Sequence, residues 1–352
     1  MKFGLTSLIP QSRHVLTSEL PGQYDCLRRA IGIMVFAEEL GFDACGIGER
    51  HDLPYLSSAP AVVLAAIAEK TSRIRLLTSV AVIGALDPVR VAEDYATVDQ
   101  LSHGRLDFMI GVGSNSTDVY GRVGLDSGRR RQFHQEKYEL LRRLWREENV
   151  TWAGAGRAPL NNVTVAPSPF NGPPRIWHGS ATSLESVELA ARWGDPIFTE
   201  NSSMPTARYV ALIDHYRQCW ADYGYAADDA VVGAGSGGFY VARTSQEALS
   251  RYRPYYEASV QAARARGKKI EFESLEDKMT TGSALVGSPA QIAEKIHELH
   301  GLLGHQVQVV NVEVLTPQEQ RATLELFMSE VAPALRAQIP TAVWDCGPVS
   351  PV

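Results

Sequence analysis

The chain has 352 residues, enough for two average domains or for one large barrel with insertions. Its 34 basic and 40 acidic side chains give a formal net charge of -6, and the basic residues are dispersed, so nothing indicates nucleic acid or an anionic membrane surface as a partner. The hydrophobic content of 45% can fill a sizeable core, which leaves small-molecule chemistry as the class of function to examine.

The first part of the chain alternates short apolar runs with amphipathic ones. A strand over 2–9 and a polar loop precede a helix that stops at Gly41. The next strand, 43–48, carries Glu49, Arg50 and His51 at its carboxyl end, and a helix over 61–69 follows. Barrel active sites are built at this edge of the strands.

Residues 75–113 contain a complete strand–helix–strand unit. The apolar run 75–82 predicts a buried strand, and Asp87 and Pro88 are typical of a helix start. The helix stops at His103-Gly104, and a second buried strand covers 106–110. A crossover of this kind makes the two strands parallel and the unit right-handed.

The same alternation continues to the C-terminus. Residues 115–128 form a polar loop, 150–174 an insertion with short β-like runs, 267–283 a long mobile loop, and 339–352 an irregular tail. The remaining predicted strands are 175–178, 196–199, 230–242 and 306–314, and the remaining helices are 132–146, 183–193, 205–223, 246–266, 288–303 and 324–335. Eight strands alternating with helices predict an α/β fold, a TIM (β/α)8 barrel with insertions, in one domain over 1–338.

Three glycines in the seventh strand have the GxGxxG spacing of a dinucleotide site. They are Gly233, Gly235 and Gly238, but Phe-Tyr-Val-Ala follows them and prefers a strand, whereas a phosphate site needs a helix there. We interpret the glycines as a bulge or a close approach of ligand.

The cysteines and the termini indicate a reduced, intracellular protein. The cysteines at 26, 45, 219 and 346 are far apart and lack the CxxC spacing of a metal or redox site. The N-terminus enters a strand directly without a signal peptide, and no apolar run reaches the length of about 18 residues that spans a membrane. We expect a soluble cytoplasmic protein without a metal site.

A long motif supports a family assignment. The run from Thr78 through DPVRVAEDYATVDQLSHGRLDF resembles the bacterial luciferase-like flavin monooxygenases, whose signature is a PVR-x-AE helix followed by D-Q-x-S-x-GR and a strand. Other segments agree in order over nearly the whole chain: KFGL, EELGFDACGIGERH, RRLWREENVTWAG, PPRIWHGS and ESVELAARWGDPIFT. Within this family, the chain resembles the luciferase α subunit.

The resemblance implies a two-component monooxygenase. A separate flavin reductase would supply reduced FMN, O2 would add to it as a flavin peroxide, and a small organic substrate would be oxygenated. A pocket lined by Phe3, Leu5, Tyr55 and Ile83 would suit an aldehyde, a ketone or an aromatic compound. Family members usually pair through early βα helices, so we expect a homodimer through the alanine-rich second and third helices, the alternative being that these alanines pack on the barrel itself.

Two alternatives stay open. The superfamily includes F420-dependent oxidoreductases, which transfer hydride without oxygen. It also includes non-catalytic partner subunits such as the luciferase β subunit. Against the second, residues 267–283 lie in the region of a mobile loop that the catalytic subunit has and the β subunit lacks.

His51 and Arg50 are the candidate catalytic residues. A histidine can move a proton near neutral pH, although it could equally be a hydrogen-bonded loop residue. The luciferase α subunit has two consecutive histidines here, and its catalytic one aligns with Arg50. Arginine cannot act as a base, but it could hold a peroxide or a substrate anion.

The resemblance also predicts the flavin contacts. Ser79-Val80 aligns with a cis peptide beneath the flavin ring, the alternative being an ordinary trans strand end, and Gly113 and Ser114 follow the fourth strand. Gly179, Ser180, Ser183 and Ser186 surround a helix start that suits the flavin phosphate, although Ser183 could simply cap that helix.

Several nearby features bear on how strongly flavin binds. Val112 replaces a phosphate-binding arginine of the family and Asn115 a tyrosine, so binding is expected to be weak unless a basic group such as Arg175 compensates. We interpret His178 as a satisfied barrel-end histidine, with a position facing the pocket as the alternative. Residues 129–131, three arginines, are expected on a solvated face, with a grip on phosphate or on an anionic reductase as the alternative.

Overall fold

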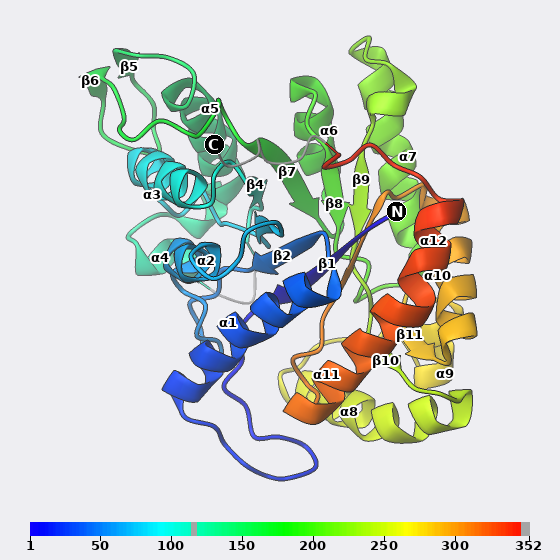
Figure 1. The fold of residues 1–352 in the computed structure, drawn as a ribbon. Helices are drawn as coiled ribbons and strands as arrows, with labels where there is room; N and C mark the ends of the chain where they lie inside the picture. The colour runs from blue at the N-terminus through cyan, green and yellow to red at the C-terminus, as the bar shows by residue number, and fades with distance from the viewer. Residues whose placement is uncertain (114–117, 346–352) are drawn as a thin grey trace.

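Eight parallel strands close into a barrel, and helices surround it (Figure 1). The computed structural model describes residues 1–113 and 118–345. The strands pair in the order β1-β12-β9-β8-β7-β4-β3-β2, so the predicted TIM barrel is confirmed. Their bounds are β1 (Lys2–Ser7), β2 (Ala44–Ile47), β3 (Arg75–Thr78), β4 (Leu106–Ile110), β7 (Arg175–Ser180), β8 (Ile197–Thr199), β9 (Val232–Ala234) and β12 (Val307–Val310).

Two helix termini fall at the predicted signals, whereas the last predicted helix, 324–335, lies within a longer helical stretch that begins at Pro317. The Asp87 side chain accepts hydrogen bonds from the Val89 and Arg90 amides at the start of α3, and Gly41 ends α1 in the left-handed conformation. The outer helices are α1 (Gln23–Leu40), α2 (Pro60–Ala68), α3 (Pro88–Leu101), α5 (Arg130–Leu144), α6 (Leu184–Trp193), α7 (Thr206–Asp222), α10 (Pro289–Leu303), α11 (Pro317–Leu326), the π-helix η3 (Phe327–Val331) and α12 (Ala332–Gln338). Shorter segments are α4 (Val119–Arg122), η1 (Ser127–Arg129) and η2 (Ala227–Asp229). None of the helices described is long and apolar enough to cross a membrane.

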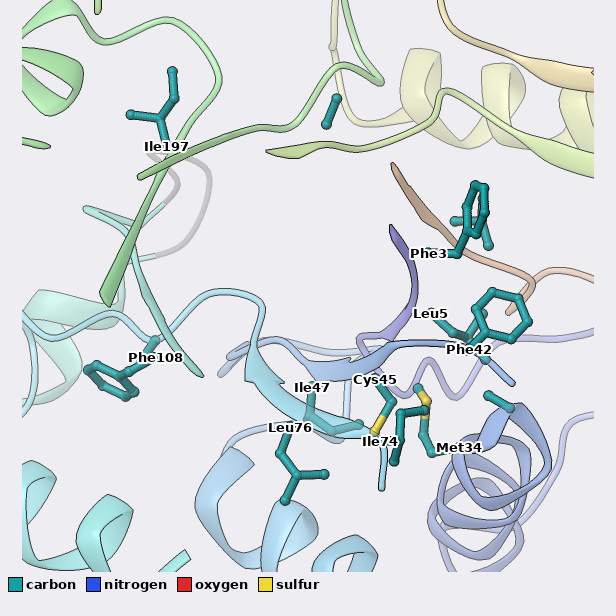
Figure 2. Close-up of a cluster of buried hydrophobic side chains, with 14 of the residues drawn as sticks. Phe3, Leu5, Met34, Phe42, Cys45, Ile47, Ile74, Leu76, Phe108 and Ile197 are labelled. Carbon is teal, nitrogen blue, oxygen red and sulfur yellow. The ribbon is translucent and has the colours of Figure 1, made fainter. Parts of the chain in front are cut away.

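Side chains alternate between two apolar layers. Figure 2 shows the layer between strands and helices, where Met34 of α1 lies close to Cys45 of β2 and Ile74. The other layer lies inside the barrel and consists of Met109, Trp177, Phe198, Val307 and Val309.

The prediction that Phe3 and Leu5 line the pocket is wrong. Both residues belong to the strand–helix layer. The Phe3 ring packs edge-on against Phe327, with ring centroids 5.1 Å apart. Because neighbouring strand residues face opposite sides, Gly4 instead faces the interior, where a Cβ on it would lie 3.0 Å from Val309.

The predicted seventh strand divides into two. Only β9 joins the barrel, and β10 (Phe239–Val241) pairs with β11 (Leu285–Gly287) in a separate parallel sheet. The three glycines permit close packing: a Cβ at Gly235 would lie 2.3 Å from the Glu200 carbonyl oxygen, and one at Gly238 would lie 2.5 Å from the Tyr252 hydroxyl. As expected, no helix follows them.

Two insertions leave the barrel. Residues 150–174 contain the antiparallel hairpin of β5 (Val150–Trp152) and β6 (Leu160–Val163), which pairs outside the barrel sheet. Between β10 and β11 lie α8 (Ser245–Ala265) and α9 (Leu275–Thr280). The prediction that 267–283 is a loop throughout is therefore wrong, because Ser274 caps α9 by accepting a hydrogen bond from the Asp277 amide.

The described part of the tail closes the amino end of the barrel. The buried Asp107 carboxylate accepts hydrogen bonds from the indole groups of Trp177 at 2.8 Å and Trp344 at 2.7 Å, and it pairs with Arg75. The tail to residue 345 is irregular in secondary structure, as expected, yet it packs on the barrel.

Candidate active site at the carboxyl end of the barrel

A hydrogen-bonded pair, Glu49 and His51, lies just after β2. The Glu49 carboxylate is 2.8 Å from His51 Nε2 through Oε1 and accepts the Val82 amide at 2.9 Å through Oε2. The Glu49 side chain is 1% exposed and that of His51 25% exposed. A buried carboxylate anchored by the backbone therefore orients a histidine that solvent or a ligand can reach.

Arg50 faces a carboxylate of its own loop. Its guanidinium donates to both carboxylate oxygens of Asp52 at 2.9 Å, and it lies 4.6 Å from the centroid of the Tyr55 ring. This bidentate pair compensates the charge that was expected to hold an anion. The site predicted from the sequence did not include Asp52, although Asp52 lies only two positions from Arg50.

The peptide between Ser79 and Val80 is cis, as the resemblance predicted. Glycines surround this segment at the ends of three strands. A Cβ at Gly48 would lie 2.4 Å from the Ser79 carbonyl oxygen, and Cβ atoms at Gly111 and Gly179 would lie 2.6 and 2.5 Å from the Val80 methyl groups. The Val80 side chain therefore occupies the space between the ends of β4 and β7.

At the start of α6 the polar groups converge on Glu185. Ser183 accepts the Ser186 amide as the helix cap, and its hydroxyl donates to the Glu185 carboxylate at 2.9 Å. Arg131 of α5 pairs with the same carboxylate. The Glu185 backbone amide and the Ser183 hydroxyl hold the pKa of Glu185 below its usual range.

The donors at the start of α6 match those that bind a phosphate group. A hydroxyl, a backbone amide and a guanidinium already hold a carboxylate at this helix start, and the same donor types bind phosphate. Ser180 lies beside them, its hydroxyl accepting the Ser183 amide at 3.1 Å. The residues therefore fit an anion, provided that the Glu185 carboxylate moves.

Other predicted residues surround the mouth or lie away from it. Gly113 has a φ of 86°, which favours glycine, and Ser114 lies outside the described residues. His178 is a buried residue of β7, and its Nε2 is 3.1 Å from the Asp195 carboxylate. The same carboxylate accepts a hydrogen bond from the Tyr138 hydroxyl. The Asp195 partner agrees with the structural interpretation of His178, although Nδ1 of the histidine has no partner among the described residues.

The sequence missed Glu313. This half-buried carboxylate follows β12 and accepts hydrogen bonds from the Ser7 hydroxyl, the Asn311 amide and the backbone of residues 8 and 9. Burial raises the pKa of Glu313 although these donors act against the shift. No separate signal in the sequence marked it, because the predicted strand 306–314 included this residue, whereas β12 ends at Val310.

Lys278 of α9 was missed as well. A Cβ at Gly237 would lie 2.8 Å from its Cε, which places the side chain over the segment after β9. Burial lowers the pKa of Lys278, and Glu200 acts against that shift. The Lys278 ammonium has no hydrogen bond or ion pair within 1–113 and 118–345. An incompletely compensated cation near the mouth can attract an anionic atom of a ligand.

Known proteins share the sequence pattern and the fold of this chain. The family model described as luciferase-like monooxygenase matches residues 1–306. An uncharacterized protein of Mycobacterium tuberculosis is 41% identical over 165 residues, which are 47% of this chain and 57% of the relative, so the match spans little more than half of that relative. The FMNH(2)-dependent dimethylsulfone monooxygenase of Pseudomonas fluorescens is 28% identical over 77% of this chain and 76% of its own.

Solved structures share the fold. The monooxygenase RslO1 from Streptomyces bottropensis is 26% identical, with a TM-score of 0.77 over 95% of this chain and 99% of that chain. The coenzyme F420-dependent tetrahydromethanopterin reductase of Methanopyrus kandleri is 17% identical, with a TM-score of 0.72 over 95% and 99%, and so shares the fold alone.

Proposed function

The chain belongs to the luciferase-like monooxygenase family, and from that premise we propose that it oxygenates a small organic substrate with reduced FMN and O2, the FMN being supplied by a separate reductase. The similarity to an FMNH(2)-dependent monooxygenase over three quarters of both chains supports reduced FMN. The observation that carries the proposal is the anchored Glu49–His51 pair beside the cis Ser79-Val80 segment at the barrel mouth.

Bound reduced FMN would supply the electrons for oxygen chemistry. In this assignment Ser79, Val80 and Gly113 would contact the flavin ring, and Gly179, Ser180, Ser183 and Ser186 would hold its phosphate. His51 holds or moves a proton at Nδ1, because its Nε2 faces Glu49. Arg50 stabilises the loop that carries His51 through its ion pair with Asp52. It can bind another anion only if this ion pair breaks.

Cofactor binding tests the assignment directly. Anaerobic titration with FMN, reduced FMN and F420 should show preferential binding of reduced FMN, in line with the FMNH(2)-dependent relative. Saturation by F420 without binding of reduced FMN would replace the proposal by the hydride-transfer alternative. No detectable binding of FMN, reduced FMN or F420 would favour a non-catalytic subunit.

The role of His51 has its own test. Replacing His51 by alanine should lower product yield and raise hydrogen peroxide release more than it weakens flavin binding. Glu49→Gln should produce a smaller change in the same direction, because its amide oxygen can still accept a hydrogen bond from His51 but lacks the charge that strengthens the bond. The exposed Glu39→Gln is the matched control and should leave both quantities unchanged.

A further inference from the structure

We propose that Glu188, His215 and Cys219 form a transition-metal site on the outside of the barrel, between α6 and α7, with Zn2+ as the ion that suits its donors. The site lies apart from the barrel mouth and is independent of the proposed function. The spacing of the cysteines along the chain did not predict it, because its ligands come from two helices.

The three ligand atoms are already close together. His215 and Cys219 are four residues apart on α7 and so share one face of that helix, while Glu188 projects from the adjacent α6. His215 Nε2 is 2.8 Å from the Glu188 carboxylate and 3.7 Å from Cys219 Sγ. All three ligand atoms lie within 4.8 Å of one another.

These separations suit a tetrahedral ion. Zinc binds thiolate at about 2.3 Å and imidazole at about 2.0–2.1 Å, which places two such ligands about 3.5 Å apart at a tetrahedral angle. The observed sulfur–nitrogen separation of 3.7 Å is near this value. The histidine–carboxylate separation must widen, and the exposed fractions of 34% for His215 and 49% for Glu188 leave their side chains free to move.

The donor types narrow the choice of ion. A thiolate and an imidazole favour Zn2+ and related transition ions over Mg2+ and Ca2+, which prefer oxygen ligands. Three protein ligands leave the fourth position to water, and the partly exposed site gives the ion direct access. The ion would replace the thiol proton of Cys219, releasing one proton to solvent, and would link α6 to α7.

Cobalt(II) is the probe, because a thiolate ligand gives it a charge-transfer band in the near ultraviolet. The folded full-length protein, reduced and free of metal, should develop this band, saturate at one equivalent, and lose it when Zn2+ is added. Cys219→Ser should abolish the band, and His215→Ala and Glu188→Gln should weaken cobalt binding by at least tenfold. Circular dichroism should show that each variant remains folded.

Three control variants separate this site from adventitious binding. Cys26→Ser removes another free thiol, Cys346→Ser replaces the cysteine that lies outside the described residues, and His297→Ala removes an exposed histidine of α10. All three should keep the band and its stoichiometry. A band that survives in Cys219→Ser, that disappears in Cys346→Ser, or that never forms in the natural protein would overturn the proposal.

Discussion

His305 is a fully buried histidine at the amino end of the barrel, just before β12. Burial lowers its pKa to about 3, with His300 acting in the same direction and Gln308 against it. The unfolded chain has a histidine pKa of about 6.5, so between about pH 3 and 6.5 the unfolded state binds more protons than the folded state. Stability from this residue is therefore complete above pH 6.5 and is lost as the pH falls through that window.

We predict that His305→Gln, which keeps a donor near Gln308, flattens the dependence of unfolding free energy on pH. The expected difference from the natural protein is about 1.4 kcal/mol per pH unit below pH 6, measured by urea unfolding between about pH 6.5 and 4.5. Asp99, whose pKa burial raises to about 6, titrates in both proteins with the opposite sign and cancels in the comparison. Equal slopes would contradict the prediction.

For Lys278 we predict opposite effects on stability and on ligand binding. Because burial disfavours its charged form, Lys278→Met should raise the unfolding free energy at neutral pH by about 1 kcal/mol. The same variant should weaken the binding of substrate or flavin, because it removes a positive charge near the barrel mouth. The exposed Lys268→Met is the control, and a loss of stability in Lys278→Met would show that the ammonium is well paired.

Among the elements, the start of α6 offers the sharpest test of flavin binding. Glu185 occupies the donors that a phosphate would need, so Glu185→Gln should tighten FMN binding by about tenfold, equivalent to 1.4 kcal/mol. Riboflavin, which lacks the phosphate, should bind as before. Titration with both ligands distinguishes this effect from a general change in the pocket.

The complementary variants act in the other direction. Ser186→Ala and Arg131→Gln should weaken FMN more than riboflavin, and Ser183→Ala should in addition destabilise the helix start by about 1 kcal/mol. Equal weakening of both ligands would mean that the phosphate binds elsewhere. Weak binding by the natural protein would agree with Val112 replacing the family arginine.

Elements were predicted best where one rule decides them. All eight barrel strands were located because a parallel strand buried on both faces is a continuous apolar run. Strand ends were less predictable, because β9 stops where Gly235 meets the Glu200 carbonyl oxygen, a contact between residues distant in sequence. Likewise His51 could be selected from its position, but the pairing of Arg50 with Asp52 depends on the folded loop.

For the whole molecule, a groove between α2 and α3 bears on the predicted dimer. Its volume is 530 Å³, and its lining is mostly apolar, including Ala61, Ala65 and Val62, the last being 70% exposed. We predict that two copies pair over this groove and that Val62→Glu shifts the protein to a monomer. Light scattering at micromolar concentration should detect the change.

The control for the dimer is Leu302→Glu, a similar change at a residue of α10 that is 49% exposed. It should leave the mass unchanged. A monomeric natural protein, or dissociation by both variants alike, would refute pairing through α2 and α3. Because Glu49 also lines the groove, dissociation should be followed by a check of product yield.

The glycines around Val80 limit how such an enzyme could diversify. At Gly48, Gly111 and Gly179 even a methyl group would lie within 2.6 Å of a neighbouring atom, so these positions should be nearly immutable in a saturation library selected for folding. Substrate range must then change through the rim, where α9 and the loops carry side chains with more freedom. A laboratory evolution campaign should accumulate its beneficial substitutions there, while the floor of the mouth stays constant.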